Sequence, residues 1–253
     1  MVRRSPLALA YHGVRAVPLR EDPMRLFCAP DQVRRDIRVL RAWGYELVTF
    51  GELAARIAGG AGSGCAALTF DDGLADNLET LVPLLRSERA AATVFVVSGW
   101  LGHRHPDAGW APILDGEGLR ALHAAGIEIG AHTITHPDLT TLPGPAAEAE
   151  LAGSRSALEA MLDAPVTVAA YPYGAADATV RDAARRAGLT AACRTSGAGN
   201  VADPFDLPRE AMGNGASRLG LRLKRGGRHE PLMRVPLMRR ARRLSRRLHA
   251  LDR

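Results

Sequence analysis

Two adjacent carboxylates are the first candidates for chemistry. Asp71 and Asp72 come directly after an apolar run, residues 65–70, and Gly73 follows them. Adjacent carboxylates at the end of a buried strand repel each other unless a metal ion or a proton gives them different roles. An acidic turn that caps the next helix is the alternative, because Asp is common in turns and at helix N-caps. This stretch alone leaves both interpretations open.

His132 and His136 form the second candidate group. They follow the apolar residues 127–131, and a spacing of four residues on one turn brings both imidazoles to one side, as a divalent metal site requires. Pro137 prevents a regular helix from continuing here, and two surface histidines in a loop are the alternative. Together with Asp72 they would make three protein ligands, which leaves coordination positions open for water and substrate.

Short apolar strands alternate with amphipathic helices along the chain. The predicted strands are residues 7–12, 45–50, 65–70, 91–97, 127–132, 166–171 and 189–194. The predicted helices are residues 30–43, 52–58, 75–87, 115–125, 145–162 and 177–187. This alternation is typical of a parallel α/β fold, and seven or eight units in this length favour a closed barrel. The candidate residues lie where strands end, which is where chemistry gathers in such barrels.

The charge of the chain is concentrated at its C-terminal end. The 253 residues carry a net charge of +6, but residues 222–253 hold twelve Arg or Lys and two acids, a net of +10. Residues 1–221 therefore carry a net of −4, so an anionic partner would bind the tail alone. The composition changes at about residue 213, which predicts a single domain followed by a basic C-terminal extension, residues 213–253.

The extension has a helical pattern from about residue 231. An apolar stripe recurs at steps of three and four residues, at Leu237, Ala241, Leu244, Leu248 and Leu251. Three uses remain open: packing on the barrel as a final helix, lying on an anionic membrane surface, and binding nucleic acid. Nucleic acid is the least favoured, because no aromatic or recognition motif accompanies the charge.

Cysteine usage and hydropathy predict the compartment. Cys28, Cys65 and Cys193 are scattered, odd in number and without metal-ligand spacing, which fits a reducing compartment or simple buried thiols. The apolar run at residues 7–10 is too short for a signal-peptide core, and no segment approaches the length of a membrane span. These features predict a cytoplasmic protein, peripheral at the inner membrane face if the tail binds lipid.

Three stretches resemble the first three motifs of the polysaccharide deacetylases, the metal-dependent carbohydrate esterase family 4 with the NodB homology domain. They are Thr-Phe-Asp-Asp-Gly at 69–73, His-Thr-Ile-Thr-His at 132–136 and Tyr-Pro-Tyr-Gly at 171–174. The resemblance covers about residues 5–212. It implies a distorted (β/α)7-type barrel that removes acetyl groups, N-acetyl before O-acetyl, from a polysaccharide, glycan or sugar conjugate.

The resemblance also implies roles for single residues. Asp71 would be the general base, and Asp72, His132 and His136 would hold a divalent metal, with zinc first and other first-row ions next. The family places a backbone N–H that stabilises the oxyanion at Tyr173. The metal would lower the pKa of a bound water, and Asp71 could take the proton as the water attacks the acetyl carbonyl.

The chain departs from the family pattern at two points. Many members have an arginine in the third motif that orients the base, but Ala170 stands there. Arg209 could supply this charge, or could be an exposed arginine. The late histidine that acts as general acid is also missing. The chain resembles a subgroup that opens with a Tyr-His strand, here Tyr11 and His12, so His12 is predicted to protonate the leaving amine; a core histidine is the alternative.

Residues 99–109 are predicted to form an irregular loop. His103 and His105 could line the substrate groove, but solvated loop histidines are the favoured interpretation. Trp100 and Trp110 could stack on sugar rings or anchor the loop.

The prediction is therefore a metal-dependent deacetylase with an acetylated sugar or glycan as its partner. The alternative is a non-catalytic glycan-binding barrel or scaffold protein at the membrane surface. A binding module has no need for an unliganded base beside a metal, which argues against this alternative. A nucleic-acid binder acting through its basic tail is the third hypothesis.

Overall fold

The structure, a computed structural model, describes residues 4–195, 199–216 and 220–222. Contacts divide the chain into two units, Met1–Ala216 and Ser217–Arg253, and all of the predicted site residues belong to the first. The helix predicted from about residue 231 lies outside the described residues. Within the described part of the chain, no helix is long and apolar enough to cross a membrane.

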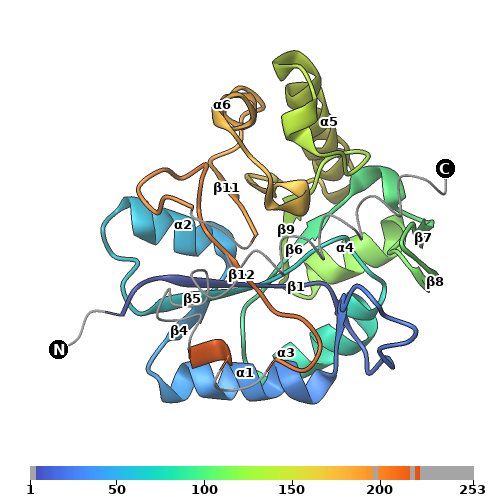
Figure 1. Cartoon of the computed structure of the whole chain (residues 1–253), viewed down its shortest axis with the longest axis vertical. Helices are drawn as coiled ribbons and strands as arrows, with labels where there is room; N and C mark the ends of the chain where they lie inside the picture. Colours follow the sequence, from blue (N-terminus) through green and yellow to red (C-terminus); the bar gives the residue numbers. More distant parts are fainter. Residues whose placement is uncertain (1–3, 196–198, 217–219, 223–253) are drawn as a thin grey trace, which may run out of the picture. The chain divides into compact units, whose positions relative to one another are not determined.

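Seven parallel strands of the described residues curl into a ring, which confirms the predicted distorted (β/α)7-type barrel (Figure 1). Their bounds are β1 (Leu7–Tyr11), β5 (Cys65–Phe70), β6 (Thr93–Val96), β9 (Glu128–Ala131), β10 (Val168–Ala170), β11 (Ala191–Cys193) and β12 (Glu210–Ala211). Neighbours in this order pair with each other up to β11, and β12 pairs with β1. A bridge from Leu207, just before β12, to Cys193 in β11 closes the ring.

An eighth strand distorts the ring. β4 (Glu46–Val48) pairs with the first half of β5, and β6 pairs with the last two residues of β5 on the same side. β5 therefore has two successive neighbours on one edge. Because β5 carries the two adjacent carboxylates at its end, only β6 and β1 flank it where the site begins.

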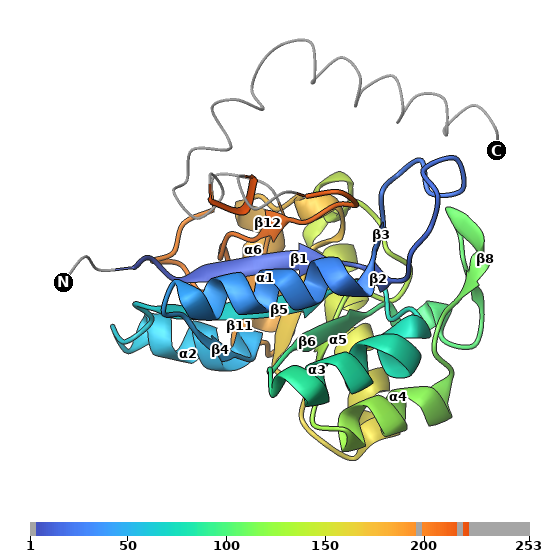
Figure 2. The ribbon, with the colours of Figure 1, turned by 90° about the horizontal axis from the view of Figure 1, so that it is seen from below.

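Among the described residues 4–216, six α-helices surround the strands (Figure 1). They are α1 (Pro30–Ala42), α2 (Phe50–Ala58), α3 (Val82–Glu88), α4 (Gly116–Ala124), α5 (Gly144–Leu162) and α6 (Ala178–Arg186). Pro30 begins α1, and the side chains of Thr49, Asp115 and Asp177 cap α2, α4 and α6 by accepting from backbone N–H groups. α1 packs against α3 (Figure 2).

Several short features differ from the prediction, among them β12, which is absent from the predicted strands, and a π-helical turn inside the predicted helix 75–87. β7 (Arg104–His105) and β8 (Ala108–Pro112) form an antiparallel hairpin where an irregular loop was expected. A π-helical turn, Asn77–Leu81, precedes α3, and β2 (Gly13–Val14) pairs with β3 (Phe27–Cys28). Elements of two residues or one turn are too short to show a hydrophobic periodicity in the sequence. Elements that are rich in Gly and Pro are too irregular to show one.

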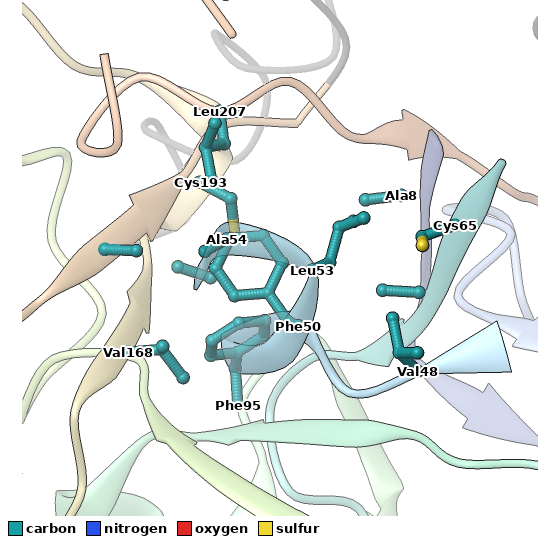
Figure 3. Packing of buried hydrophobic residues seen from close by; sticks show 13 residues of the cluster. Ala8, Val48, Phe50, Leu53, Ala54, Cys65, Phe95, Val168, Cys193 and Leu207 are labelled. Carbon is teal, nitrogen blue, oxygen red and sulfur yellow. The ribbon is translucent and has the colours of Figure 1, made fainter. Parts of the chain in front are cut away.

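The interior of the ring changes from apolar to polar along β5. Cys65 of β5, Phe50 of α2 and Phe95 of β6 belong to one buried apolar cluster (Figure 3). The rings of Phe50 and Phe95 meet edge to face, with centroids 5.6 Å apart. Side chains alternate along a strand, so Thr69 and Asp71 continue the same inward face toward the carboxyl end of β5. The core therefore ends directly beneath Asp71.

Candidate active site

The predicted site residues meet at one end of the ring, because all its strands are parallel and most of these residues follow the carboxyl end of a strand. Arg209 is the exception, since it directly precedes β12. The others are His12 after β1, Asp71 and Asp72 after β5, His132 and His136 after β9, and Tyr173 in a 3-10 turn after β10 (Pro172–Gly174).

Asp72, His132 and His136 converge on one point. Oδ1 of Asp72 lies 3.7 Å from Nε2 of His132 and 3.8 Å from Nε2 of His136. The three ligand atoms all lie within 4.8 Å of one another. An ion with bonds of about 2.0–2.1 Å and tetrahedral geometry holds its ligand atoms about 3.3 Å apart, so the set would contract on binding. Nδ1–H of His132 donates to the Ala170 carbonyl at 2.8 Å, which leaves the lone pair on Nε2. These donors therefore fit a first-row divalent ion.

Hydrogen bonds, rather than a helix, hold the turn that carries the two histidines. Thr133 and His136 have left-handed φ angles of 69° and 60°, which cost about 1–2 kcal/mol each for a residue with a side chain. Glu150 of α5 accepts from the backbone N–H of Ile134 at 2.8 Å and of the next residue at 2.9 Å. The turn thereby brings the rings of His132 and His136 to a centroid distance of 4.8 Å.

Asp71 forms a two-point ion pair with Arg209. Nη1 donates to Oδ1 at 2.6 Å and Nη2 donates to Oδ2 at 2.8 Å. The same guanidinium donates to the hydroxyls of Thr69 and Thr195, both at 2.8 Å, and Arg209 is 1% exposed. The interpretation of Arg209 as an exposed arginine is therefore wrong. Ala170, at the position of the family arginine, supplies only its carbonyl to the site.

The surroundings lower the pKa of both carboxyl groups. Burial alone would raise the pKa of Asp71, but the Arg209 guanidinium outweighs it. Burial would also raise the pKa of Asp72. The hydrogen bond from His105 and the charges of the other site histidines together outweigh burial, so the pKa is lowered. Burial lowers the pKa of His136 to about 4. At neutral pH the carboxyl groups are ionised and His136 is neutral, which are the forms that bind metals.

His105 in β7 also lies in the site, although the sequence did not predict it. Its side chain is buried, and its Nε2 lies 3.1 Å from Oδ2 of Asp72. The interpretation as a solvated loop histidine is wrong for His105, whereas His103 is exposed as expected. No local signal in the sequence separates the two, because the hairpin that delivers His105 has no recognisable period.

His12 lies at the rim of the site. Its Nε2 is 3.9 Å from Oδ2 of Asp72, and 29% of its side chain is exposed, so it contacts both the site and solvent. The alternative of a fully buried core histidine is wrong. The Asn77 side-chain amide, in the π-helical turn, donates to the His12 carbonyl at 3.1 Å and holds this part of the backbone.

Aromatic rings border the imidazole of His136. Tyr173 is 54% exposed and has a left-handed φ of 58°. The centroid of its ring lies 4.8 Å from that of His136, and the centroid of the Trp100 ring lies 5.0 Å from the same imidazole. The ring of Trp110 instead packs on that of Phe27, with centroids 4.8 Å apart. Its indole N–H donates to the backbone carbonyl of Glu21, which belongs to residues 13–27. Trp110 thus anchors the hairpin to that segment, which lies beside β8 in both views (Figures 1 and 2).

The sequence matches known proteins over its central part. The family model described as polysaccharide deacetylase matches residues 58–192, just over half of the chain. The chain is 31% identical over 124 residues to YxkH of Bacillus subtilis (strain 168), and 32% identical over 123 residues to a chitooligosaccharide deacetylase of Rhizobium leguminosarum bv. trifolii. These matches cover 49% and 48% of this chain, and 42% and 52% of the two relatives, so the chain spans about half of their length.

Solved structures share the fold over a larger part of the chain. The deacetylase PplD of Streptococcus pyogenes, solved in complex with acetate, superposes with a TM-score of 0.75. The superposition covers 88% of this chain and 99% of that chain, at 22% sequence identity. At this identity the likeness concerns the fold, and it extends well beyond residues 58–192.

Proposed function

This chain belongs to the polysaccharide deacetylase family, and we propose that it is a metal-dependent hydrolase that removes acetyl groups from an acetylated sugar or glycan. One observation carries the proposal: a set of three metal-ligand atoms from Asp72, His132 and His136 lies beside Asp71, a carboxylate outside that set. Binding alone would need the ligands but no second buried carboxylate.

In this proposal Asp71 is the general base. The two-point pair with Arg209 keeps its carboxylate ionised and fixes its plane, because the guanidinium fork matches both oxygens. Each oxygen keeps a second lone pair, so the ion pair leaves room to accept a proton from water. Arg209 thereby takes the orienting role that the third-motif arginine has in many members of the family.

Asp72, His132 and His136 hold the metal in this proposal. A divalent ion bound there would lower the pKa of a water molecule and polarise the acetyl carbonyl. Two imidazoles and one carboxylate suit zinc, and other first-row divalent ions remain compatible. The hydrogen bond from His132 Nδ1–H to the Ala170 carbonyl orients that ring and raises its basicity as a ligand.

His12 and Tyr173 complete the proposed chemistry. His12, partly exposed at the rim, would donate a proton to the leaving amine as the C–N bond breaks. The backbone N–H of Tyr173, in the left-handed turn after β10, would donate to the oxyanion that forms at the acetyl carbonyl. Both assignments follow the positions of these residues at the same end of the ring.

An N-acetylated amino sugar is the substrate class that we propose. A relative with 32% identity is named as a chitooligosaccharide deacetylase, and this supports an N-acetyl group as the target. The exposed ring of Tyr173 beside the histidines offers a flat apolar face, as sugar rings require.

The experiment is a measurement of acetate release from a panel: N-acetylglucosamine oligomers, N-acetylated sugar conjugates and O-acetylated xylan. We expect release from at least one N-acetylated substrate, loss of release with a chelator, and recovery with added Zn²⁺ or another first-row ion. Sugar binding without acetate release from any substrate would favour a non-catalytic glycan-binding barrel and overturn the proposal.

A further inference from the structure

The buried ring of His105 has a defined tautomer. Its Nδ1 accepts the backbone N–H of Asp107 at 3.1 Å, so in the neutral ring the proton must sit on Nε2. That Nε2–H then donates to Oδ2 of Asp72 at 3.1 Å. With its only lone pair used by Asp107, the ring acts as a hydrogen-bond donor to Asp72 and not as a further metal ligand.

The two oxygens of Asp72 therefore face different partners. Oδ1 faces Nε2 of His132 and His136, at 3.7 and 3.8 Å. Oδ2 accepts from His105 at the shorter distance of 3.1 Å. A carboxylate with one oxygen engaged in this way offers only the other oxygen to an ion, so its ligation is restricted to one atom.

The same hairpin also restrains the backbone after Asp72. Leu114, just past β8, donates its N–H to the Gly73 carbonyl at 2.9 Å, and Ala75 donates to the Pro112 carbonyl at 2.9 Å. Asp72 itself has a left-handed φ of 76°, which is strained for a residue with a side chain. One element thus pairs with the turn that follows Asp72 and delivers the imidazole that contacts its side chain.

We propose that His105 is a positioning residue that fixes Asp72 as a one-oxygen metal ligand and so sets the affinity and coordination number of the site. The inference rests on the metal site of the proposed function. Three protein donors, one from each residue, suit a small first-row ion with few ligands. A two-oxygen carboxylate would move the site toward the six to eight oxygen ligands that Ca²⁺ takes.

Two amide variants separate the contact with Asp72 from the packing of the ring. His105→Gln places an N–H donor where Nε2 stands, so it can still reach Oδ2 of Asp72. His105→Asn is one methylene shorter; it can still accept from the Asp107 N–H but cannot reach Asp72. His103→Ala, two residues away and exposed, is the matched control. Thermal unfolding in chelator checks that each variant folds.

The measurements are Zn²⁺ affinity by competition with a chromophoric chelator, and the visible absorption of the Co²⁺-loaded proteins, both without substrate. We expect His105→Asn to weaken Zn²⁺ binding by about 10–100-fold, and to weaken the visible Co²⁺ bands, which lose intensity as coordination number rises. His105→Gln and His103→Ala should stay near wild type in both measurements.

Wild-type affinity and spectrum in His105→Asn would overturn the inference, and so would a His105→Gln variant as weak as His105→Asn. A wild-type protein that binds neither Zn²⁺ nor Co²⁺ would instead overturn the proposed metal site itself. The two failures are therefore distinguishable without an activity assay.

Discussion

The two carboxylates at the end of β5 are adjacent in sequence but lie in different surroundings. Asp71 continues the inward face of β5 and pairs with one permanent cation, the guanidinium of Arg209. Asp72 turns away through a left-handed φ and is surrounded by imidazoles, among them His105 and His132. The inner region thus has a fixed charge balance, whereas the outer region consists of groups that can bind a cation.

This difference separates the roles of two identical side chains. A carboxylate held at both oxygens by a guanidinium is neutralised already, so a metal ion gains little by binding it. A carboxylate beside His132 and His136 attracts a cation, and Nε2 of each of these two imidazoles can add a lone pair. In the proposed mechanism, partner residues from distant strands, and not residue type, therefore give Asp71 the proton and Asp72 the metal.

The largest expected effects come from changing each carboxylate alone. Asp71→Asn should lower acetate release by about 10²–10⁴-fold, because the base is lost, while bound metal stays at the wild-type level. Asp72→Asn should lose the metal itself. Elemental analysis and acetate release on both variants check this. Metal loss of equal size in both variants would contradict the separation of roles.

Arg209 should affect stability as well as activity. Arg209→Ala leaves Asp71 buried without its cation, and breaking a buried pair costs about 3–5 kcal/mol of unfolding free energy. Arg209→Lys keeps the charge but loses the fork, so it should fold and release acetate more slowly with unchanged metal content. Urea unfolding and turnover test this, with Arg38→Ala, at a surface pair with Glu88, as control. Wild-type turnover in Arg209→Lys would show that orientation of Asp71 is unimportant.

The effect of His12→Ala should depend on the leaving group. The variant should release acetate from an N-acetyl sugar about 100-fold more slowly, because an amine leaves poorly without a proton. With 4-nitrophenyl acetate, whose leaving group is stable as an anion, the defect should almost vanish. The exposed His123→Ala is the control. An equal defect on both substrates would rule out the acid role.

Within the part of the chain that the structure describes, Asp76 is a buried carboxyl group with neither a paired guanidinium nor a cluster of imidazoles beside it. The expected effect of changing it is smaller than the effects of changing Asp71, Arg209 or His12. Burial raises its pKa to about 6, so the folded state holds a proton that the unfolded state loses near pH 4. Its contribution to stability is therefore present below pH 4 and lost as pH rises to about 6. At pH 7 the free energy of unfolding of Asp76→Asn should exceed that of wild type by about 1–3 kcal/mol. At pH 4 this excess should be smaller.

Urea unfolding in chelator at both pH values measures this difference. The comparison is made between variant and wild type, so that His136 and other titrating groups cancel. Asp31→Asn, with 91% of the Asp31 side chain exposed, should show no such pH dependence. If Asp76→Asn raised the free energy of unfolding by the same amount at pH 4 and at pH 7, the raised pKa of Asp76 would be contradicted.

The sequence predicted the order of strands and helices and the end of the barrel where the ligands meet. Strand-end positions such as Asp72 and His132 could be assigned because apolar runs fix strand ends and parallel strands place those ends together. The partners could not be assigned from strand ends: Arg209 was only one of two alternatives as the partner of Asp71, and His105 was favoured as a solvated loop histidine. Arg209 reaches Asp71 across 138 residues through the closure of the ring, and His105 reaches Asp72 through a hairpin without a period. Such contacts depend on topology, which local patterns do not encode.

A metal titration of the chelator-treated protein tests whether acetate release depends on one bound divalent ion. Acetate release from an N-acetylglucosamine oligomer is measured as Zn²⁺ is added in known amounts. We expect no release without metal, a rise in proportion to added ion, and a plateau at about one ion per chain. Release that is independent of metal, or that continues to rise well beyond one bound ion per chain, would contradict it.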